Sequence, residues 1–277
     1  MEIAKRQLGK TGAEVTILGL GGEGVLRTFG HETQAYRLIN RAIDLGMNYF
    51  ESARAYAGSE SYYGHALRER RKEIFLTSKS HARHREGALV HLNETLTNMQ
   101  TDYLDLWQVH DVRTDQDVQA IFGPGGALEA FVEAKARGLV RFIGVTGHHD
   151  PRILLRCIEM FDFDTVLLPV NPAEPSHRSF LDSVVPKANE REMGVIGMKV
   201  YFRGFASRIP WYKSMEPFFR YALSQPVSTA VIGCESLEQL EENVGFARSF
   251  TPMTREEADA LVMRVAPLAR ALMYYKP

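Results

Sequence analysis

The amino-acid sequence predicts an α/β protein built as a single (β/α)8 TIM barrel over residues 1–277. Eight short apolar runs alternate with longer segments of helical period, and eight such units in about 250 residues match this barrel. Neither a Pro-, Gly- or Ser-rich linker nor a low-complexity tract separates the two halves of the chain. A length of 277 residues is also sufficient for one large core.

A small β-hairpin is expected ahead of the barrel. The segment AKRQLGKTGAEVTIL turns at Lys10-Thr11-Gly12, and a hairpin there would plug the bottom of the barrel. The barrel strands are predicted where the runs are apolar and β-branched, at residues 15–22, 47–52, 73–80, 102–110, 140–147, 164–171, 194–201 and 228–235.

Helical periodicity predicts helices between these strands, among them residues 32–46, 85–100, 125–138 and 236–250. The third of these segments has cations in its last turn and Gly138 as its predicted C-cap. The fourth begins with Ser236 and carries Gln239 three residues later, which is the pattern of a capping box.

The composition excludes several classes of partner. With 33 Lys+Arg and 34 Asp+Glu the net charge is −1, so neither nucleic acid nor an anionic membrane is expected to bind. No apolar run approaches the length of a membrane span. Cys157 and Cys234 lie far apart and form no metal or disulfide pattern, and MEIAKRQLGKTG has no apolar signal region. Together these features predict a cytoplasmic protein.

The segment ILGLGGEG carries Gly19, Gly21 and Gly24 at the G-x-G-x-x-G spacing of dinucleotide-binding folds. In such folds the third glycine lies at the start of a helix, where a pyrophosphate binds. Here the first good helical stretch begins only near Glu32. Glu51 at the end of the second strand favours the dinucleotide fold, whereas eight regular units without a second domain favour the barrel. The glycines are therefore interpreted as positions of close backbone approach.

Polar side chains end most of the predicted strands, where barrel enzymes carry their chemistry. Taken singly, a charge at a strand end is usually solvated and a tyrosine is usually packed. A glutamate, a lysine, a histidine and a tyrosine at one barrel mouth are harder to explain by packing, because burying charges is costly. The set comprises Glu51, Tyr56, Lys79, His110, Thr146, His148, Asn171, Lys199 and the turn Gly233–Ser236.

Several segments, in the correct order along nearly the whole chain, resemble motifs of the aldo-keto reductases. The resemblance implies a (β/α)8 barrel that uses NAD(P)H to reduce a small-molecule aldehyde or ketone, or catalyses the reverse oxidation. The matching segments are QLGKTGAEVTILGLGG, GMNYFESARAYAGSESYYGHAL, IFLTSK, DYLDLWQVH, GLVRFIGVTG and VIGCESLEQLEENV.

The resemblance further implies a catalytic tetrad of Glu51, Tyr56, Lys79 and His110. Tyr56 would protonate the carbonyl oxygen, although a phenol with a pKa of about 10 is a poor acid at neutral pH. We therefore expect Lys79 to lower the pKa of Tyr56. Glu51 would hold Lys79 by an ion pair, and His110 would orient the carbonyl oxygen. The usual acid of the family is Asp, and a carboxylate displaced by about 1 Å can be costly in catalysis.

The same resemblance implies a nicotinamide cofactor. Thr146 stands where the family often has Ser, Leu167 replaces an expected Gln, and Met198 replaces a stacking aromatic residue. Glu235 would repel a 2′-phosphate and favours NAD(H), but family habit favours NADP(H), which is slightly preferred overall. The residues predicted to bind the cofactor are Gly21, Gly22, Thr146, Asn171, Met198, Lys199, Val200, Gly233, Cys234, Glu235, Ser236, Gln239, Glu242 and Asn243.

Two other functions stay open. The departures at Glu51 and Leu167 suggest a catalytically weak or inactive barrel that binds NAD(P)H and senses the redox state. Alternatively, Lys79 could be the Schiff-base amine of an isomerase or lyase, which leaves EQLEENV without a role. No metal is expected, because no H-x-H ends the first strand and no acidic cluster accompanies the histidines.

Two expectations concern the rim of the barrel. His148 and His149 follow the fifth strand and are expected to be solvated. The C-terminal tail RVAPLARALMYYKP is short, and in the resembled family this tail often covers the substrate pocket. A short tail therefore predicts an open site for bulky or varied carbonyls. No feature of the sequence fixes the oligomeric state.

Overall fold

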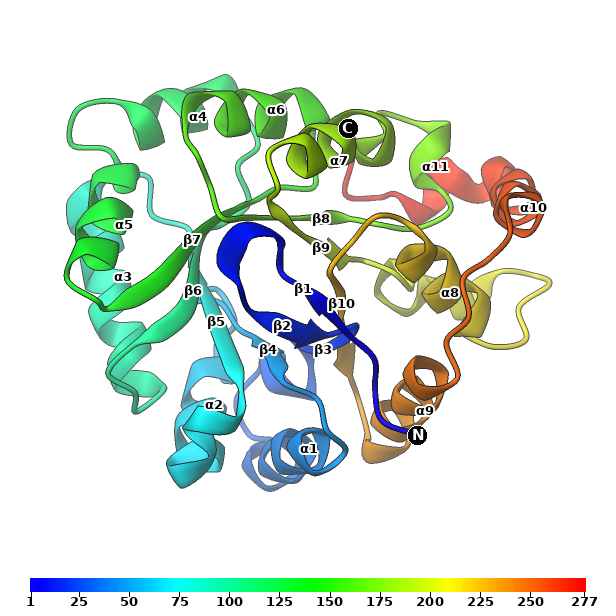
Figure 1. The fold of residues 1–277 in the computed structure, drawn as a ribbon, viewed down its shortest axis with the longest axis horizontal. Coiled ribbons are helices and arrows are strands. Elements are labelled where there is room, and N and C mark those ends of the chain that lie inside the picture. Colours follow the sequence, from blue (N-terminus) through cyan, green and yellow to red (C-terminus); the bar gives the residue numbers. More distant parts are fainter.

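The eight predicted strand segments all form strands, and these close into one parallel barrel (Figure 1). This computed structural model describes all of residues 1–277. The strands follow one another around the barrel in chain order, and the last pairs with the first to complete the ring. The barrel strands are β3 (Leu18–Gly24), β4 (Tyr49–Glu51), β5 (Phe75–Ser80), β6 (Leu104–Val109), β7 (Val140–Thr146), β8 (Thr165–Pro169), β9 (Gly194–Met198) and β10 (Thr229–Cys234); the hairpin strands are β1 (Lys5–Gln7) and β2 (Glu14–Thr16).

Helices connect successive strands on the outside of the barrel, as the alternating pattern predicts. Thr114 and Asp117 form a reciprocal capping box at the start of α4, and Asp150 caps α6 ahead of Pro151. None of the helices has both the length and the apolar character that crossing a bilayer requires. The helices are α1 (Glu32–Asp44), α2 (Ser59–Leu67), α3 (Arg85–Asn98), α4 (Asp115–Phe122), α5 (Ala127–Ala136), α6 (Pro151–Met160), α7 (Phe180–Glu190), α8 (Glu216–Ser224), α9 (Leu237–Arg248), α10 (Arg255–Val265) and α11 (Ala269–Leu272).

Two helix ends differ in detail from the sequence-based prediction. Helix α5 ends with Arg137 as its C-cap, and Gly138 follows it with a left-handed φ of 73°. Ser236 caps α9 by accepting a hydrogen bond from the Gln239 N–H, as predicted. The Gln239 side chain, however, accepts from the Glu235 N–H at 2.8 Å. The capping box at α9 is therefore not reciprocal.

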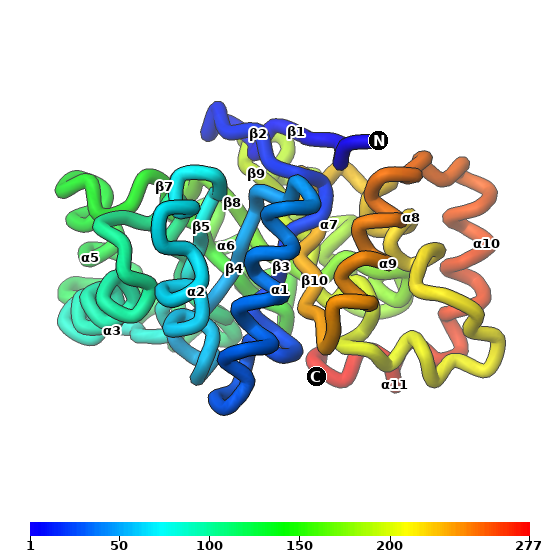
Figure 2. The backbone as a smooth tube through the Cα atoms, turned by 90° about the horizontal axis from the view of Figure 1, so that it is seen from below, coloured from blue at the N-terminus to red at the C-terminus, as the bar shows by residue number.

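The predicted hairpin closes the N-terminal ends of the barrel strands. Strands β1 and β2 pair antiparallel, and Leu8 between them is fully buried. Leu8 and Val15 pack against the inward-facing side chains of the barrel. The Lys10 N–H donates to the carbonyl oxygen of Glu192, just before β9. Figure 2 shows the hairpin at one end of the barrel and the C-terminus at the opposite end.

The strand residues alternate between two cores. Leu106 faces the barrel interior, whereas its neighbour Trp107 faces outward and stacks on Phe131 of α5, with ring centroids 3.7 Å apart. Because both faces of each strand are buried, the strands read as nearly continuous apolar runs in the sequence. The interior core comprises Leu8, Val15, Tyr49, Phe75, Leu106, Leu167, Ile196 and Val231.

The glycine-rich first barrel strand allows close backbone approach, as predicted, and the closed barrel excludes the dinucleotide fold. Helix α1 starts only at Glu32. Gly24 has a φ of 69°, and a Cβ atom there would lie 2.4 Å from the carbonyl oxygen of Cys234. A Cβ atom on Gly22 would lie 2.8 Å from the ring of Tyr56. Glycine therefore lets β3 approach both β10 and the loop that carries Tyr56.

Candidate active site

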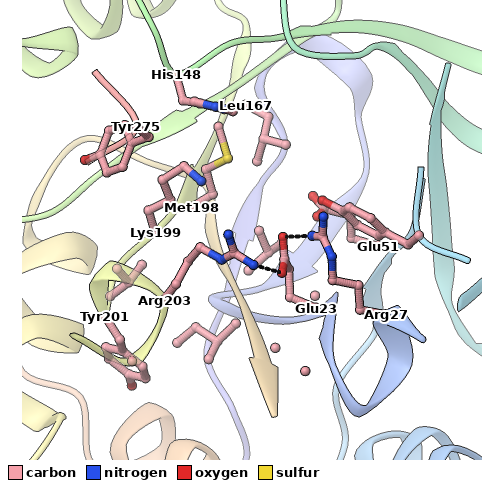
Figure 3. A pocket seen from close by; sticks show the side chains of 18 of the residues that line it. Glu23, Arg27, Glu51, His148, Leu167, Met198, Lys199, Tyr201, Arg203 and Tyr275 are labelled. Atoms are coloured by element: carbon pink, nitrogen blue, oxygen red, sulfur yellow. Dashed lines mark hydrogen bonds and ion pairs between the residues drawn. The ribbon is translucent and has the colours of Figure 1, made fainter. Parts of the chain in front are cut away.

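A cavity of about 1050 Å³ opens at the C-terminal ends of the barrel strands (Figure 3), the face where barrel enzymes carry their chemistry. Every barrel strand contributes to its lining, either directly or through the residue that follows it. The predicted site residues that line the cavity are Gly21, Glu51, Tyr56, Lys79, His110, Thr146, Met198, Lys199, Val200, Gly233, Glu235, Gln239, Glu242 and Asn243.

Four predicted cofactor residues do not line the cavity but lie directly behind its wall. Gly22 makes room for the Tyr56 ring, and Ser236 caps α9. Asn171 is fully buried, and its side-chain amide donates to the hydroxyl of Tyr275 at 3.0 Å. Cys234 is buried as well, and its Sγ lies 3.6 Å from the Asn243 amide nitrogen. These residues can shape the cavity wall, and their contact with a cofactor stays a prediction.

The four predicted catalytic residues meet in the cavity from three neighbouring strands and one loop. Glu51 ends β4, Lys79 lies in β5, and His110 directly follows β6. Tyr56 lies in the loop between β4 and α2. That loop is held to the next strand, because the Arg54 N–H donates to the Lys79 carbonyl oxygen at 3.0 Å. Barrel closure thus brings together residues that are distant in sequence.

Glu51 and Lys79 form a buried ion pair at the base of the cavity. Lys79 Nζ lies 2.9 Å from Glu51 Oε1 and donates to the Ser52 carbonyl oxygen at 2.8 Å. The two side chains are only 1% and 5% exposed. Burial lowers the pKa of Lys79, while the Glu51 carboxylate opposes this effect. The longer acid at position 51 therefore reaches the lysine fully.

The Tyr56 ring lies between several charged groups. Lys79 Nζ is 5.1 Å from its centroid, the Arg27 guanidinium is 4.9 Å away, and the His110 ring centroid is 6.0 Å away. Burial raises the pKa of Tyr56 well above 10, and the nearby Glu51 carboxylate raises it further. The expected lowering of the pKa of Tyr56 is therefore wrong, because burial and the Glu51 carboxylate both raise that pKa.

His110 is a neutral imidazole at the side of Tyr56. Burial lowers its pKa well below 6.5, and the Lys79 ammonium lowers it further. Its Nδ1 is buried without a hydrogen-bond partner. A neutral ring carries one N–H, so His110 can donate a single hydrogen bond to a ligand in the cavity.

Sequence reasoning missed a charged cluster at the mouth of the cavity. The Glu23 carboxylate lies between Arg27 and Arg203 and pairs with both, as the dashed lines in Figure 3 show. The Arg203–Glu23 ion pair has a length of 3.2 Å and connects β3 with the segment that follows β9. No local pattern marks this cluster, because Arg203 is 180 residues away from Glu23.

His148 is not solvated as expected. It is half-buried, lines the cavity, and its Nδ1 lies 3.4 Å from Asp111 Oδ1. Asp111 in turn pairs with Arg113, and its backbone has a left-handed φ of 55°. Burial lowers the pKa of His148 to about 4, and the Lys199 ammonium contributes to this shift while Asp111 opposes it. His148 is therefore uncharged at neutral pH.

This depressed pKa predicts a pH-dependent stability. Between pH 6.5 and 4 the unfolded chain protonates His148 more readily than the folded protein does. The free energy of unfolding should fall across this window by up to about 3 kcal/mol from this residue. Urea unfolding at several pH values should give a shallower fall for His148→Gln, whereas His65→Gln, at an exposed histidine, should follow the wild type. Parallel curves for wild type and His148→Gln would contradict the assignment.

The size and the charge of the cavity suit an anionic cofactor. Its volume slightly exceeds the range of about 300–1,000 Å³ that is typical for small-molecule sites. Arg27, Lys199 and Arg203 line it and give its wall positive charge, which suits an anionic ligand. Thr146 accepts a hydrogen bond from the Asp111 N–H at 2.8 Å, so its own hydroxyl proton is available to a ligand. The side chain of Asn243 is less available to a ligand, because its amide oxygen already accepts a hydrogen bond from the Tyr201 hydroxyl at 2.7 Å.

The short C-terminal tail lies at the cavity and forms part of its wall. Tyr274 and Tyr275 both line the cavity. The Tyr275 ring contacts His148 edge-to-face, with ring centroids 5.9 Å apart. Lys276, next in the chain, pairs with the fully buried Glu174 at 2.6 Å. Even this short tail reaches the cavity and is anchored there, whereas an open site for bulky or varied carbonyls stays a prediction.

The fold and the cavity together define a class, namely a barrel enzyme with a tyrosine, a lysine–carboxylate pair and a histidine in a cleft that fits a dinucleotide. The sequence profile of the Aldo/keto reductase family matches residues 17–209. The chain belongs to the aldo/keto reductase family, as the resemblance implies. It is thus an NAD(P)H-dependent oxidoreductase of the class that reduces carbonyl groups.

Individual relatives agree with this assignment. The uncharacterized oxidoreductase YqkF of Bacillus subtilis is 23% identical, over 93% of this chain and 95% of its own. The holo form of aldo-keto reductase AKR11C1 from Bacillus halodurans superposes with a TM-score of 0.80 at 23% identity, over 95% and 96% of the two chains. An aldo-keto reductase from Klebsiella pneumoniae in complex with NADPH has a TM-score of 0.77 at 21% identity, over 96% of each chain.

Proposed function

We propose that this protein reduces an aldehyde or ketone to an alcohol, with Tyr56 as the proton donor and a bound nicotinamide dinucleotide as the hydride source. The observation that supports this proposal most directly is the grouping of Tyr56, the buried Glu51–Lys79 pair and neutral His110 in one large cavity. Burying charged groups is costly, so such groups are usually found together in a protein interior only where they form an ion pair or take part in a reaction.

In the proposed reaction the nicotinamide, when bound, supplies a hydride to the carbonyl carbon. The Tyr56 O–H bond breaks, and its proton moves to the carbonyl oxygen as the C=O π electrons become a lone pair there. The raised pKa of Tyr56 keeps the phenol protonated before the reaction. Transfer is still favourable, because an alkoxide is a stronger base than a phenolate.

The neighbouring residues assist this transfer. His110 donates its N–H to the carbonyl oxygen and orients it. Lys79 stabilises the phenolate that Tyr56 leaves behind, and Glu51 fixes the position of Lys79. The lysine is a poor Schiff-base nucleophile in this arrangement, because its Nζ already donates to Ser52 and pairs with Glu51.

NADP(H) is proposed as the preferred cofactor, with a small margin over NAD(H). The Klebsiella pneumoniae relative binds NADPH, and Arg27 and Arg203 add positive charge at the cavity mouth. Glu235 is exposed beside α9 and favours NAD(H) through repulsion of a 2′-phosphate. Fluorescence titration with both cofactors tests the preference, and a large advantage of NADH would reverse it.

The reductase proposal is tested with purified protein, NADPH and 4-nitrobenzaldehyde, by following the loss of NADPH absorbance and the formation of the alcohol. Turnover supports the proposal. Tight cofactor binding without turnover of a broad aldehyde panel would instead favour the redox-sensing barrel. Borohydride trapping of a carbonyl compound on Lys79, without hydride transfer, would favour the lyase.

Shortening the acid at position 51 should impair this reaction. In Glu51→Asp the carboxylate withdraws from Lys79 by about the length of one methylene, and kcat should fall by a factor of about 10–100. Steady-state kinetics check this effect, and Glu51→Gln, which keeps the length but removes the charge, separates geometry from electrostatics. An increase in kcat for Glu51→Asp would show that the longer acid is poorly placed.

A further inference from the structure

Lys199 is the one cation of the cavity lining without a carboxylate partner. It directly follows β9, is half-buried, and has no acidic group within the 4.0 Å that defines an ion pair. The other lining cations are paired: Lys79 with Glu51, Arg113 with Asp111, and both Arg27 and Arg203 with Glu23.

The position of Lys199 is firmly fixed. Its backbone has a left-handed φ of 56°, which is unfavourable for a lysine. Its carbonyl oxygen accepts hydrogen bonds from the Phe202 N–H at 3.0 Å and from the Asn171 side-chain amide at 3.3 Å. Asn171 is itself bonded to the Tyr275 hydroxyl. The site therefore holds the lysine in a strained conformation at the cavity wall.

The Lys199 ammonium faces the side of the cavity that is formed by the C-terminal tail. Its Nζ lies 5.1 Å from the centroid of the Tyr275 ring, and that ring also contacts His148. Figure 3 shows Lys199 between Met198 and Tyr275, below His148. His148 is near Asp111, which directly follows His110 in the chain. The cavity wall thus runs from Lys199 past Tyr275 and His148 toward His110 in the proposed reaction centre.

We propose that Lys199 binds the carboxylate of the substrate, so that the preferred substrates are aldehydes or ketones that carry a carboxylate group. The inference rests on the proposed reductase function and specifies its substrate class. One unpaired ammonium matches one carboxylate in charge, and the half-buried position of Lys199 beside the Tyr275 ring strengthens the attraction. A carbonyl substrate without an anionic group would gain nothing from this contact.

The sequence-based prediction places Lys199 among the residues that bind the cofactor, and the experiment separates that role from substrate binding. The values of kcat/KM are measured for 4-carboxybenzaldehyde and for its uncharged methyl ester, methyl 4-formylbenzoate. The proteins are the wild type, Lys199→Met, Lys199→Arg and the matched control Lys213→Met, which removes an exposed lysine that does not line the cavity. The Kd of NADPH is measured for each protein.

The wild type should favour the acid over the ester by at least tenfold in kcat/KM, and Lys213→Met should do the same. Lys199→Met should lower the ratio of kcat/KM for the acid to kcat/KM for the ester at least tenfold. Lys199→Arg should keep most of the preference. An unchanged ratio in Lys199→Met would overturn the proposal, as would a weakened Kd for NADPH with equal losses for both aldehydes.

A binding measurement keeps this proposal distinct from the reductase function. With saturating NADPH, 4-(hydroxymethyl)benzoate and its methyl ester are titrated into the wild type and Lys199→Met. Tighter binding of the acid that disappears in Lys199→Met supports the carboxylate site even if no aldehyde is reduced, in which case only the reductase proposal fails. Equal binding of acid and ester by the wild type would overturn the carboxylate site.

Discussion

Replacing Tyr56 with Phe should lower kcat for aldehyde reduction by a factor of about 10²–10⁴, the usual contribution of a positioned acid. The substitution removes only the proton donor, because the ring remains between Arg27 and Lys79. The Kd of NADPH should therefore stay within about twofold of the wild type. Steady-state kinetics with 4-nitrobenzaldehyde and a fluorescence titration of the cofactor measure the two quantities.

The matched control is Tyr103→Phe, which removes a phenol outside the cavity that contacts Arg71. It should leave kcat unchanged. The raised pKa of Tyr56 adds a second readout, because the phenol stays protonated throughout the neutral range. The wild-type kcat should not fall with rising pH until above pH 10. Substantial kcat in Tyr56→Phe, or a decline of kcat beginning near neutral pH, would show that another group donates the proton.

Replacing Lys276 with Met should lower the free energy of unfolding by about 3–5 kcal/mol, the usual cost of breaking a buried ion pair from one side. Lys276 and Glu174 are both fully buried, 2.6 Å apart. Lys276 also donates to the carbonyl oxygens of His177 and Arg178, each at 3.0 Å. Without it, the Glu174 carboxylate stays buried without its counter-ion. Urea unfolding measures the loss.

Two companion variants make this result specific. The double variant Glu174→Gln with Lys276→Met removes both charges and should recover part of the lost stability. Lys187→Met breaks a surface pair with Glu190 and should change the free energy of unfolding by less than about 1 kcal/mol. Equal losses in the free energy of unfolding for Lys276→Met and Lys187→Met would show that burial of the Lys276–Glu174 pair does not add to stability.

The same substitution should also affect the cavity, because the Tyr275 hydroxyl donates to Glu174 at 2.9 Å beside the lysine. Loss of Lys276 should loosen the wall that Tyr275 provides and raise the KM of small substrates more than that of the cofactor. The C-terminal tail therefore connects the stability of the fold with the shape of the substrate site.

Much of the fold could be predicted from the sequence, because strand and helix signals are local. The eight strand segments, the hairpin turn at Lys10-Thr11-Gly12 and the start of α1 at Glu32 all follow from neighbouring residues. The grouping of Glu51, Lys79 and His110 also follows, since parallel barrel strands present their C-terminal ends on one face.

The sequence by itself thus determined the order of strands and helices, the closed barrel and the residues at its mouth. These features could be predicted because hydrophobic periodicity is a property of short stretches of chain. Only the tertiary structure decided the state of those residues. The pKa of Tyr56 depends on its burial and on the nearby Glu51 carboxylate, and Glu174 pairs with Lys276, which is 102 residues away in the chain. Electrostatic energies depend on the distance between charges and on their burial, and both quantities are set by the tertiary structure rather than by the order of residues in the chain.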